Sequence, residues 1–309
     1  MLKITDGLEM PVPDVIATPS LKWNQLLGGG LWTDRMHTFW GNPGGGKTTM
    51  SLKILAEAQK KGYKPVMVDT EGTMPVSHMI RCGLDVGKDQ FIYLKGYNEL
   101  EAIQKEILPL MRNGNKYTFL FDSINGIVRS DFFDKDEKHG GMALFARSQN
   151  ELALKLNGHL TTDHMVIFVA QQTVDLGNMA SPTVGKYGNA IDHYSTNIIK
   201  IYGSWAKGEM EKNEDGSISD RTVMWNFTKS KQAAITGAGG TYSFNIATAE
   251  IDNDAELIDI AGQYDIIDTS KKGWLGYKGQ SYRKADLVNV ISDPDERQVI
   301  LDTIESLNG

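Results

Sequence analysis

The stretch GNPGGGKTT, Gly41–Thr49, decides the fold class. It satisfies the pattern GxxxxGK[ST], in which glycines allow backbone N–H groups to turn inward around a phosphate. The stretch follows a predicted strand and precedes a predicted helix, which is the context that the pattern requires. A flexible glycine-rich surface turn is the alternative reading. We predict a phosphate-binding loop at the N-terminus of a helix.

The composition of this loop is suited to ATP together with Mg²⁺. Lys47 is expected to reach the β- and γ-phosphate oxygens, and the Thr48 hydroxyl is suited to bind Mg²⁺. The other residues of the loop that we expect to contact the nucleotide are Gly41, Asn42, Pro43, Gly44, Gly45, Gly46 and Thr49. ATP and Mg²⁺ are therefore the predicted cofactors.

Two acidic residues follow predicted strands elsewhere in the chain. The strand YTFLFDS leads to Asp122, which we expect to hold Mg²⁺ through water, opposite Thr48. The stretch KPVMVDTEG places Glu71 just past Asp69, and Glu71 is the candidate for orienting the attacking water. Taken alone, Asp122 is also suited to cap a helix and Glu71 to form a salt bridge at the end of a loop.

Strand and helix patterns alternate along most of the chain. Apolar runs predict strands at 35–41, 64–71, 91–96, 117–123, 165–172 and 196–203. Helical spacing of apolar residues occurs at 48–62, 98–114 and 142–160. After Ser204, a charged hairpin tip at 207–220 precedes two added strands, expected to be antiparallel, at 222–231 and 240–247. This order predicts an α/β fold with a mostly parallel central sheet.

The same patterns suggest how the chain is divided into domains. We expect an N-terminal arm at 1–20, a core at 21–256 and a small C-terminal α/β domain at 257–309. The last of these has an expected aromatic cluster of Trp274, Tyr277 and Tyr282.

Bulk composition is typical of a globular protein of the cytoplasm. Of the 309 residues, 40% are hydrophobic and 23% are charged, and no apolar run is long enough to span a bilayer. The beginning, MLKITDGLEMPVPD, lacks the layout of a signal peptide, and the one cysteine, Cys82, fits a reducing compartment. A net charge of −7 argues against a uniformly basic nucleic-acid binder, although a local basic surface can still bind phosphates.

The chain resembles the RecA family of DNA strand-exchange ATPases over nearly its whole length. The stretches that carry the resemblance occur in the family's order: VIATPSLKWNQLLGGG, the phosphate loop, DTEG, FDS, MALFARSQNELALKL, IFVAQ, GNA, TKSKQAAITG and GWLGYKG. The resemblance implies a RecA-like P-loop ATPase core, and the short length resembles that of a phage-type member.

The resemblance also implies roles for particular residues. Lys47, Thr48, Glu71 and Asp122 match the family's hydrolysis residues. Gln171 matches the glutamine that senses the γ-phosphate and links it to a DNA-binding loop; capping of a strand is the alternative. Lys229 and Lys231 match the pair that one protomer inserts into its neighbour's ATP site, whereas the residues alone also fit a solvated edge strand. His78 falls where the family often stacks a tyrosine on adenine.

Two stretches correspond to the family's DNA-binding loops, namely 130–141 and 172–188. The residues that we expect to contact DNA are Met142, Arg147, Gln172, Val174, Leu176, Met179, Lys186, Gly188 and Asn189. The second loop is expected to be mobile without DNA, because its glycines and small polar residues offer little to bury.

The leading function is an ATP-dependent recombinase, that is, a DNA-dependent ATPase. It would form a helical filament on single-stranded DNA and pair this DNA with a homologous duplex. The alternatives are a RecA-fold ATPase of another class, such as a ring helicase motor or a regulatory ATPase, and a DNA-binding scaffold that hydrolyses little ATP. The expected partners are single- and double-stranded DNA and further copies of the chain, with no membrane.

Overall fold

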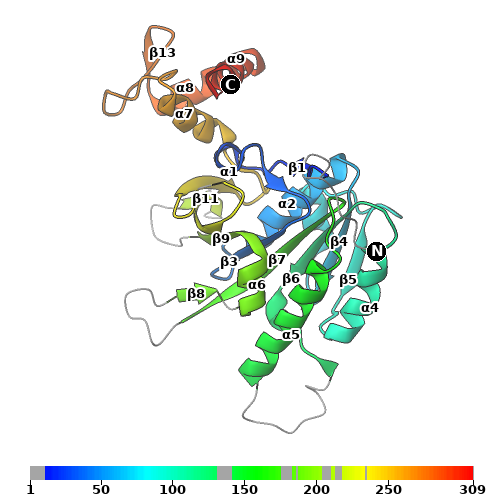
Figure 1. Ribbon diagram of the computed structural model, residues 1–309. Coiled ribbons are helices and arrows are strands. Elements are labelled where there is room, and N and C mark those ends of the chain that lie inside the picture. Colours follow the sequence, from blue (N-terminus) through cyan, green and yellow to red (C-terminus); the bar gives the residue numbers. More distant parts are fainter. Residues whose placement is uncertain are drawn as a thin grey trace.

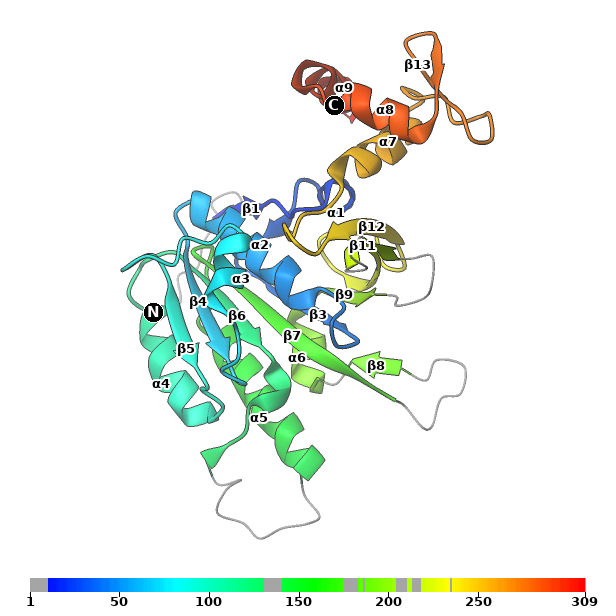
Figure 2. The same ribbon diagram turned by 180° about the vertical axis from the view of Figure 1, so that it is seen from behind.

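The computed structural model consists of a large sheet-and-helix core joined to a smaller C-terminal lobe (Figures 1 and 2). The structure describes residues 11–130, 141–174, 183–185, 187–203, 210–212, 218–233 and 235–308. In this part of the chain, no helix combines the length and the apolar character needed to cross a membrane.

One large sheet forms the centre of the core. Among the described residues it contains ten strands, of which six neighbouring ones run parallel. In spatial order the six are β9 (Ser195–Gly203), β3 (Met36–Gly41), β7 (His164–Val174), β6 (Tyr117–Asp122), β4 (Lys64–Asp69) and β5 (Ile92–Lys95). Each of the six predicted strands forms, and the prediction of an α/β fold with a mostly parallel sheet is confirmed.

Antiparallel strands extend the sheet beyond β9. They are β11 (Ile218–Ser230), which pairs with β9, and its two partners β10 (Met210–Lys212) and β12 (Gly239–Asn245). The predicted antiparallel addition is therefore confirmed.

Strand β7 continues to Val174, past the predicted strand end at Gln172 and into the predicted mobile loop. A short strand, β8 (Thr183–Gly185), pairs antiparallel with the last residues of β7, so that Gln172 lies opposite Gly185. The prediction missed this ribbon because its residues show no alternation of apolar and polar side chains.

Helices cover both faces of the sheet (Figures 1 and 2). One face packs against α1 (Leu21–Leu27), α2 (Lys47–Lys60) and α3 (Val76–Arg81). The other packs against α4 (Leu100–Leu110), α5 (Gly141–Asn157) and α6 (Asn189–Tyr194). Each face has its own hydrophobic core, and successive residues of β4 point into alternate cores. Met67 packs in the core on the α2 face, and Val66 and Val68 pack in the core on the α5 face. Burial on both faces explains the near-continuous apolar runs.

Helix α1 belongs to the core and also contacts the C-terminal lobe. Its N-cap, Ser20, accepts a hydrogen bond from the backbone N–H of Trp23. The Ser20 hydroxyl also donates to Glu256 at 2.8 Å, and Glu256 lies on α7 (Asn253–Gln263). Trp23 is fully buried and its ring meets Phe39 edge-on at 5.7 Å. The small strands β1 (Val15–Ile16) and β2 (Leu31–Trp32) pair beside this helix.

The C-terminal lobe has an apolar core of its own. Besides α7 it contains β13 (Leu275–Tyr277), β14 (Gln280–Tyr282), α8 (Lys284–Ile291) and α9 (Pro294–Asn308). Tyr277 is buried in this core and Tyr282 packs at its edge. Trp274 is 42% exposed instead, with the Arg283 guanidinium 4.2 Å from its ring centroid, so the predicted three-membered aromatic cluster is wrong in this respect. The division at residues 20 and 256 stays a proposal.

A buried polar network ties β3 and β9 to the segment after β11. His37 is fully buried; its Nε2 donates to the carbonyl oxygen of Trp32 at 3.0 Å, and its Nδ1 accepts from Asn197 at 3.2 Å. Asn197 in turn accepts from the Ser230 hydroxyl at 2.7 Å and donates to Gln232 at 3.0 Å. The network needs a neutral imidazole, because a proton on Nδ1 would oppose the amide N–H of Asn197.

This histidine should make the protein less stable in mild acid. Burial lowers the pKa of His37 from 6.5 to about 4. Between these pH values the unfolded chain takes up a proton that the folded chain does not, so the free energy of unfolding falls as the pH falls, by roughly 3 kcal/mol in total. Urea titrations at several pH values measure this slope.

The slope of the wild-type protein should exceed that of His37→Asn, even if the variant is less stable at pH 7. Equal slopes for the wild-type protein and His37→Asn would contradict the assignment.

Candidate active site

The register of the sheet brings the predicted site residues to one edge. Asp69 at the end of β4 lies opposite Asp122 at the end of β6, and Gly41 at the end of β3 lies opposite Gln171 on β7. All four strands are parallel, so their carboxyl ends meet along this edge.

The phosphate loop crosses this edge from β3 to α2. Gly41 has φ of 150°, and a Cβ at this position would come within 1.9 Å of the carbonyl oxygen of Ile201, so only glycine fits. Lys47, the first residue of α2, is 8% exposed, and its Nζ donates to the carbonyl oxygens of Gly41 at 3.0 Å and Asn42 at 2.7 Å. Burial lowers the pKa of Lys47. The ammonium group therefore lies inside the loop, where a phosphate would meet it.

Thr48 and Asp122 meet beside Lys47. The Thr48 hydroxyl donates to Asp122 Oδ2 at 2.5 Å. Burial raises the pKa of Asp122 to about 6, although the Thr48 hydroxyl and the Lys47 ammonium group act to lower it. The Thr48 hydroxyl and the Asp122 carboxylate both offer oxygen atoms, which are the ligands that Mg²⁺ prefers. Among the described residues, no group of three histidine, cysteine or acidic side chains that could hold a metal ion is found.

A cavity of about 230 Å³ opens in front of this pair. It is lined by Lys47, Thr48 and Asp122 and also by Glu71 and Gln171. The structure thus brings together the five residues that the sequence predicts around the γ-phosphate.

The position of Glu71 depends on Asp69, which the sequence analysis did not assign. The Asp69 carboxylate accepts backbone N–H groups of Glu71, Gly72 and Met74 at 2.9–3.1 Å and the Tyr93 hydroxyl at 2.6 Å. Burial raises the pKa of Asp69, but these hydrogen bonds outweigh it and lower the pKa overall. Asp69 therefore fixes the turn that presents Glu71 to the cavity. An aspartate two residues before a candidate catalytic acid is the signal that could have revealed it.

Gln171 lies where the cavity meets the ribbon of β7 and β8. Its backbone N–H donates to Asn125 Oδ1 at 2.7 Å, and its side chain is exposed. The next residue, Gln172, is already paired with β8.

His78 lies next to Thr49, the last residue of the phosphate loop. Its Nε2 is 3.2 Å from the Thr49 hydroxyl, so α3 holds the ring beside the start of α2. Burial lowers the pKa of His78. The neutral form of the ring is thereby favoured, and a neutral ring can stack on a base through its face.

Lys229 and Lys231 lie away from the cavity of their own chain. Both donate to carbonyl groups at the C-terminal end of α6: Lys229 to Asp192, and Lys231 to His193 at 2.8 Å. A cation is favoured at this end of a helix. The two ammonium groups are thus held together on one surface.

Those of the predicted DNA-contact residues that the structure describes lie on three elements. Met142 and Arg147 are on α5, where Arg147 is exposed; Gln172 and Val174 are on β7; Gly188 and Asn189 begin α6. Leu176, Met179 and Lys186 lie outside the described residues. Gly188 packs closely against α5, because a Cβ there would come within 2.5 Å of Asn150 Oδ1 and 3.1 Å of the carbonyl oxygen of Ala146. The same Asn150 oxygen accepts the backbone N–H of Ala190 at 2.9 Å, which joins the two helices that follow the predicted DNA loops.

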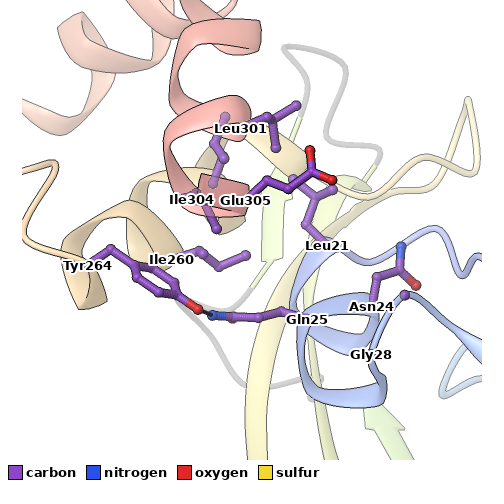
Figure 3. A pocket seen from close by; sticks show the side chains of 11 residues that line it. Leu21, Asn24, Gln25, Gly28, Ile260, Tyr264, Leu301, Ile304 and Glu305 are labelled. Atoms are coloured by element: carbon purple, nitrogen blue, oxygen red, sulfur yellow. Dashed lines mark hydrogen bonds between the residues drawn. The ribbon is translucent and has the colours of Figure 1, made fainter. Parts of the chain in front are cut away.

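A larger cavity, of about 490 Å³, lies between α1 and the C-terminal lobe (Figure 3). Its lining is mainly aliphatic, from Leu21, Ile260 and Leu301, and Gln25 donates to the Tyr264 hydroxyl at 3.3 Å. Its lining includes the acidic Glu305 but no basic side chain and no residue of the phosphate loop, so it lacks the cations that phosphate chemistry requires.

Comparison with known proteins agrees with this geometry. The family model described as the RecA N-terminal domain matches residues 1–235. The chain is also 30% identical over 277 residues to "Protein RecA" of Wolinella succinogenes, an alignment that covers 87% of this chain and 75% of that protein. The chain belongs to the RecA family. The phosphate loop, both strand-end acids and Gln171 all fall within the part that matches the family model, whereas the C-terminal lobe lies beyond it.

Proposed function

We propose that this RecA-family chain is a DNA-dependent ATPase that forms a filament on single-stranded DNA and exchanges strands with a homologous duplex. The observation that carries the proposal is the position of Gln171. It lines the cavity of Lys47, Asp122 and Glu71 and is followed directly by the β7–β8 ribbon. A neutral amide there can hydrogen-bond a γ-phosphate and so bias the ribbon that continues into the proposed DNA loop.

The chemistry proposed at this site is hydrolysis of ATP to ADP and phosphate. Lys47 binds the β- and γ-phosphates, and Thr48 with Asp122 holds Mg²⁺, which neutralises phosphate charge when it is bound. Glu71, presented by the Asp69 turn, orients the attacking water. His78 contacts the base from beside Thr49.

Lys229 and Lys231 are proposed to complete the site of a neighbouring protomer. They stand together at the end of α6, outside their own cavity. Insertion into the neighbour would exchange the α6 carbonyl groups for phosphate oxygens, which are stronger acceptors for a cation. Hydrolysis would therefore depend on the filament, in the cytoplasm where its DNA lies.

Gln171→Ala should uncouple ATP from DNA affinity. In the wild-type protein, single-stranded DNA should bind more tightly with a nonhydrolysable ATP analogue than with ADP. The variant should keep ATP binding but bring the ratio of the two DNA affinities close to one, because the link between γ-phosphate and ribbon is lost.

Fluorescence anisotropy of a labelled oligonucleotide measures this ratio. Gln263→Ala, an exposed glutamine at the end of α7, is the matched control and should behave as the wild-type protein. A wild-type ratio in Gln171→Ala would show that the switch runs through other residues.

The whole proposal is tested by ATPase and strand-exchange assays on the purified protein. Hydrolysis should be stimulated by single-stranded DNA of any sequence, and a labelled strand should be transferred from a homologous duplex but not from an unrelated one. Stimulation of hydrolysis together with unwinding but no exchange would favour a ring helicase motor instead.

A further inference from the structure

A second cavity lies on the opposite side of the phosphate loop from Glu71. It measures about 160 Å³ and is lined by the loop residues 44–49 and by Arg221. Gly44, Lys47 and Thr48 line both cavities. The loop therefore separates a cavity that contains the acids from a smaller one into which a basic side chain reaches.

Arg221 is held firmly in place. It lies on β11 and is 7% exposed, and its guanidinium carbon is 5.8 Å from the ring centroid of Phe244, its partner residue on β12. One terminal nitrogen, Nη2, lies 3.6 Å from the position that a Cβ of Gly46 would occupy. Arginine stays charged in proteins even where burial lowers its pKa, as it does here. A positive charge is thus fixed beside the loop.

The two cavities give the direction in which a nucleotide would lie. Glu71, Asp122 and Gln171 mark the γ-phosphate end, on one side of the loop. Thr49 lines the other cavity and is in contact with His78, so it marks the base end. In a nucleotide, the α-phosphate is the phosphate nearest the base. Arg221 lines the same cavity as Thr49, so it lies where the α-phosphate would be.

We propose that Arg221 binds the α-phosphate of the nucleotide within its own chain. This inference rests on the proposed nucleotide binding and adds a contact that the phosphate-loop pattern does not contain. A guanidinium presents its N–H donors in a fixed direction, here toward one of the two α-oxygens, as a flexible ammonium group does not. Strand β11 would then contact two nucleotides: Arg221 would bind the nucleotide of its own protomer, and Lys229 would bind that of the neighbouring protomer.

The contact has a distinctive consequence. ADP and ATP carry the same α-phosphate. Loss of Arg221 should therefore lower the affinities for both nucleotides by the same factor, about 10- to 100-fold for a charge-assisted contact. Arg221→Met suits this test, because its unbranched side chain can still cover Phe244. Calorimetric titrations with Mg–ADP and with a nonhydrolysable ATP analogue measure both factors.

The control is Arg35→Met, which also removes an arginine beside an aromatic ring, here Trp32 at 6.0 Å, but at the other end of β3. It should leave both affinities unchanged. If wild-type and Arg35→Met proteins bind nucleotide and Arg221→Met does so equally well, the α-phosphate contact is wrong while the proposed function stands. A wild-type protein that binds neither nucleotide contradicts both.

A second measurement places the contact on the α-phosphate and does not depend on a fully stable variant. ADP with one α-oxygen replaced by sulfur exists as two diastereomers, and a guanidinium held at one oxygen should distinguish them. Arg221→Lys keeps the positive charge but loses the rigid, planar arrangement of N–H donors. The ratio of the affinities for the two diastereomers should therefore differ by about threefold or more between the wild-type protein and this variant. An unchanged ratio would place Arg221 on another part of the nucleotide and overturn the proposal.

Discussion

Glu71→Gln should slow ATP hydrolysis by about 10²-fold or more while ATP affinity stays near that of the wild-type protein. Glu71 lines the cavity of Thr48 and Asp122 but belongs neither to the phosphate loop nor to the proposed Mg²⁺ pair, so its loss removes water orientation and little binding. Single-turnover hydrolysis with excess protein and single-stranded DNA measures the chemical step.

Two comparisons make this prediction specific. Lys47→Ala should lose nucleotide affinity, since Lys47 Nζ lies inside the loop. Glu57→Gln, on the outer side of α2 and paired with Lys60, should change neither rate nor affinity. Unchanged turnover in Glu71→Gln would rule out its assigned role.

Replacing both Lys229 and Lys231 with alanine should abolish DNA-stimulated hydrolysis and leave nucleotide binding by the isolated protomer nearly intact. Neither ammonium group reaches the cavity of its own chain, because both are bound at the end of α6. Stimulation by DNA should therefore be lost without loss of nucleotide affinity. Lys271 and Lys272 in the C-terminal lobe, replaced together by alanine, provide a control with the same loss of charge.

Mixing variants tests whether the sites are shared between protomers. A protomer that lacks the two lysines still has Glu71, and a Glu71→Gln protomer still has the lysines. At interfaces where the first supplies the cavity and the second supplies the lysines, a complete site is restored. Mixtures should therefore hydrolyse more ATP than either variant alone; equal activity would mean that each site is complete within one chain.

The strands and the main helices were predictable because burial on both faces leaves a strong local pattern. KPVMVD and YTFLFD are mainly apolar runs that end in acids, and they are neighbours in the sheet as β4 and β6. The loop pattern placed Lys47 and Thr48 in the same way, since the residues that make the phosphate site are adjacent in the sequence.

Residues whose role depends on distant pairing could not be predicted in this way. The hydrogen bond from the Tyr93 hydroxyl to Asp69 depends on the pairing of β4 with β5, which the local sequence does not show. Arg221 is far from the phosphate loop in the sequence and meets it because β9 joins β3 to β11. The ribbon of β7 and β8 is stabilised by backbone pairing, which leaves no side-chain periodicity to read.

Electron microscopy of the protein with single-stranded DNA tests the central claim, an ATP-dependent filament, most directly. With Mg²⁺ and a nonhydrolysable ATP analogue, continuous helical filaments should cover the DNA, and with ADP they should be absent or short. Closed rings with the analogue, or DNA coverage that does not depend on which nucleotide is present, would contradict the account.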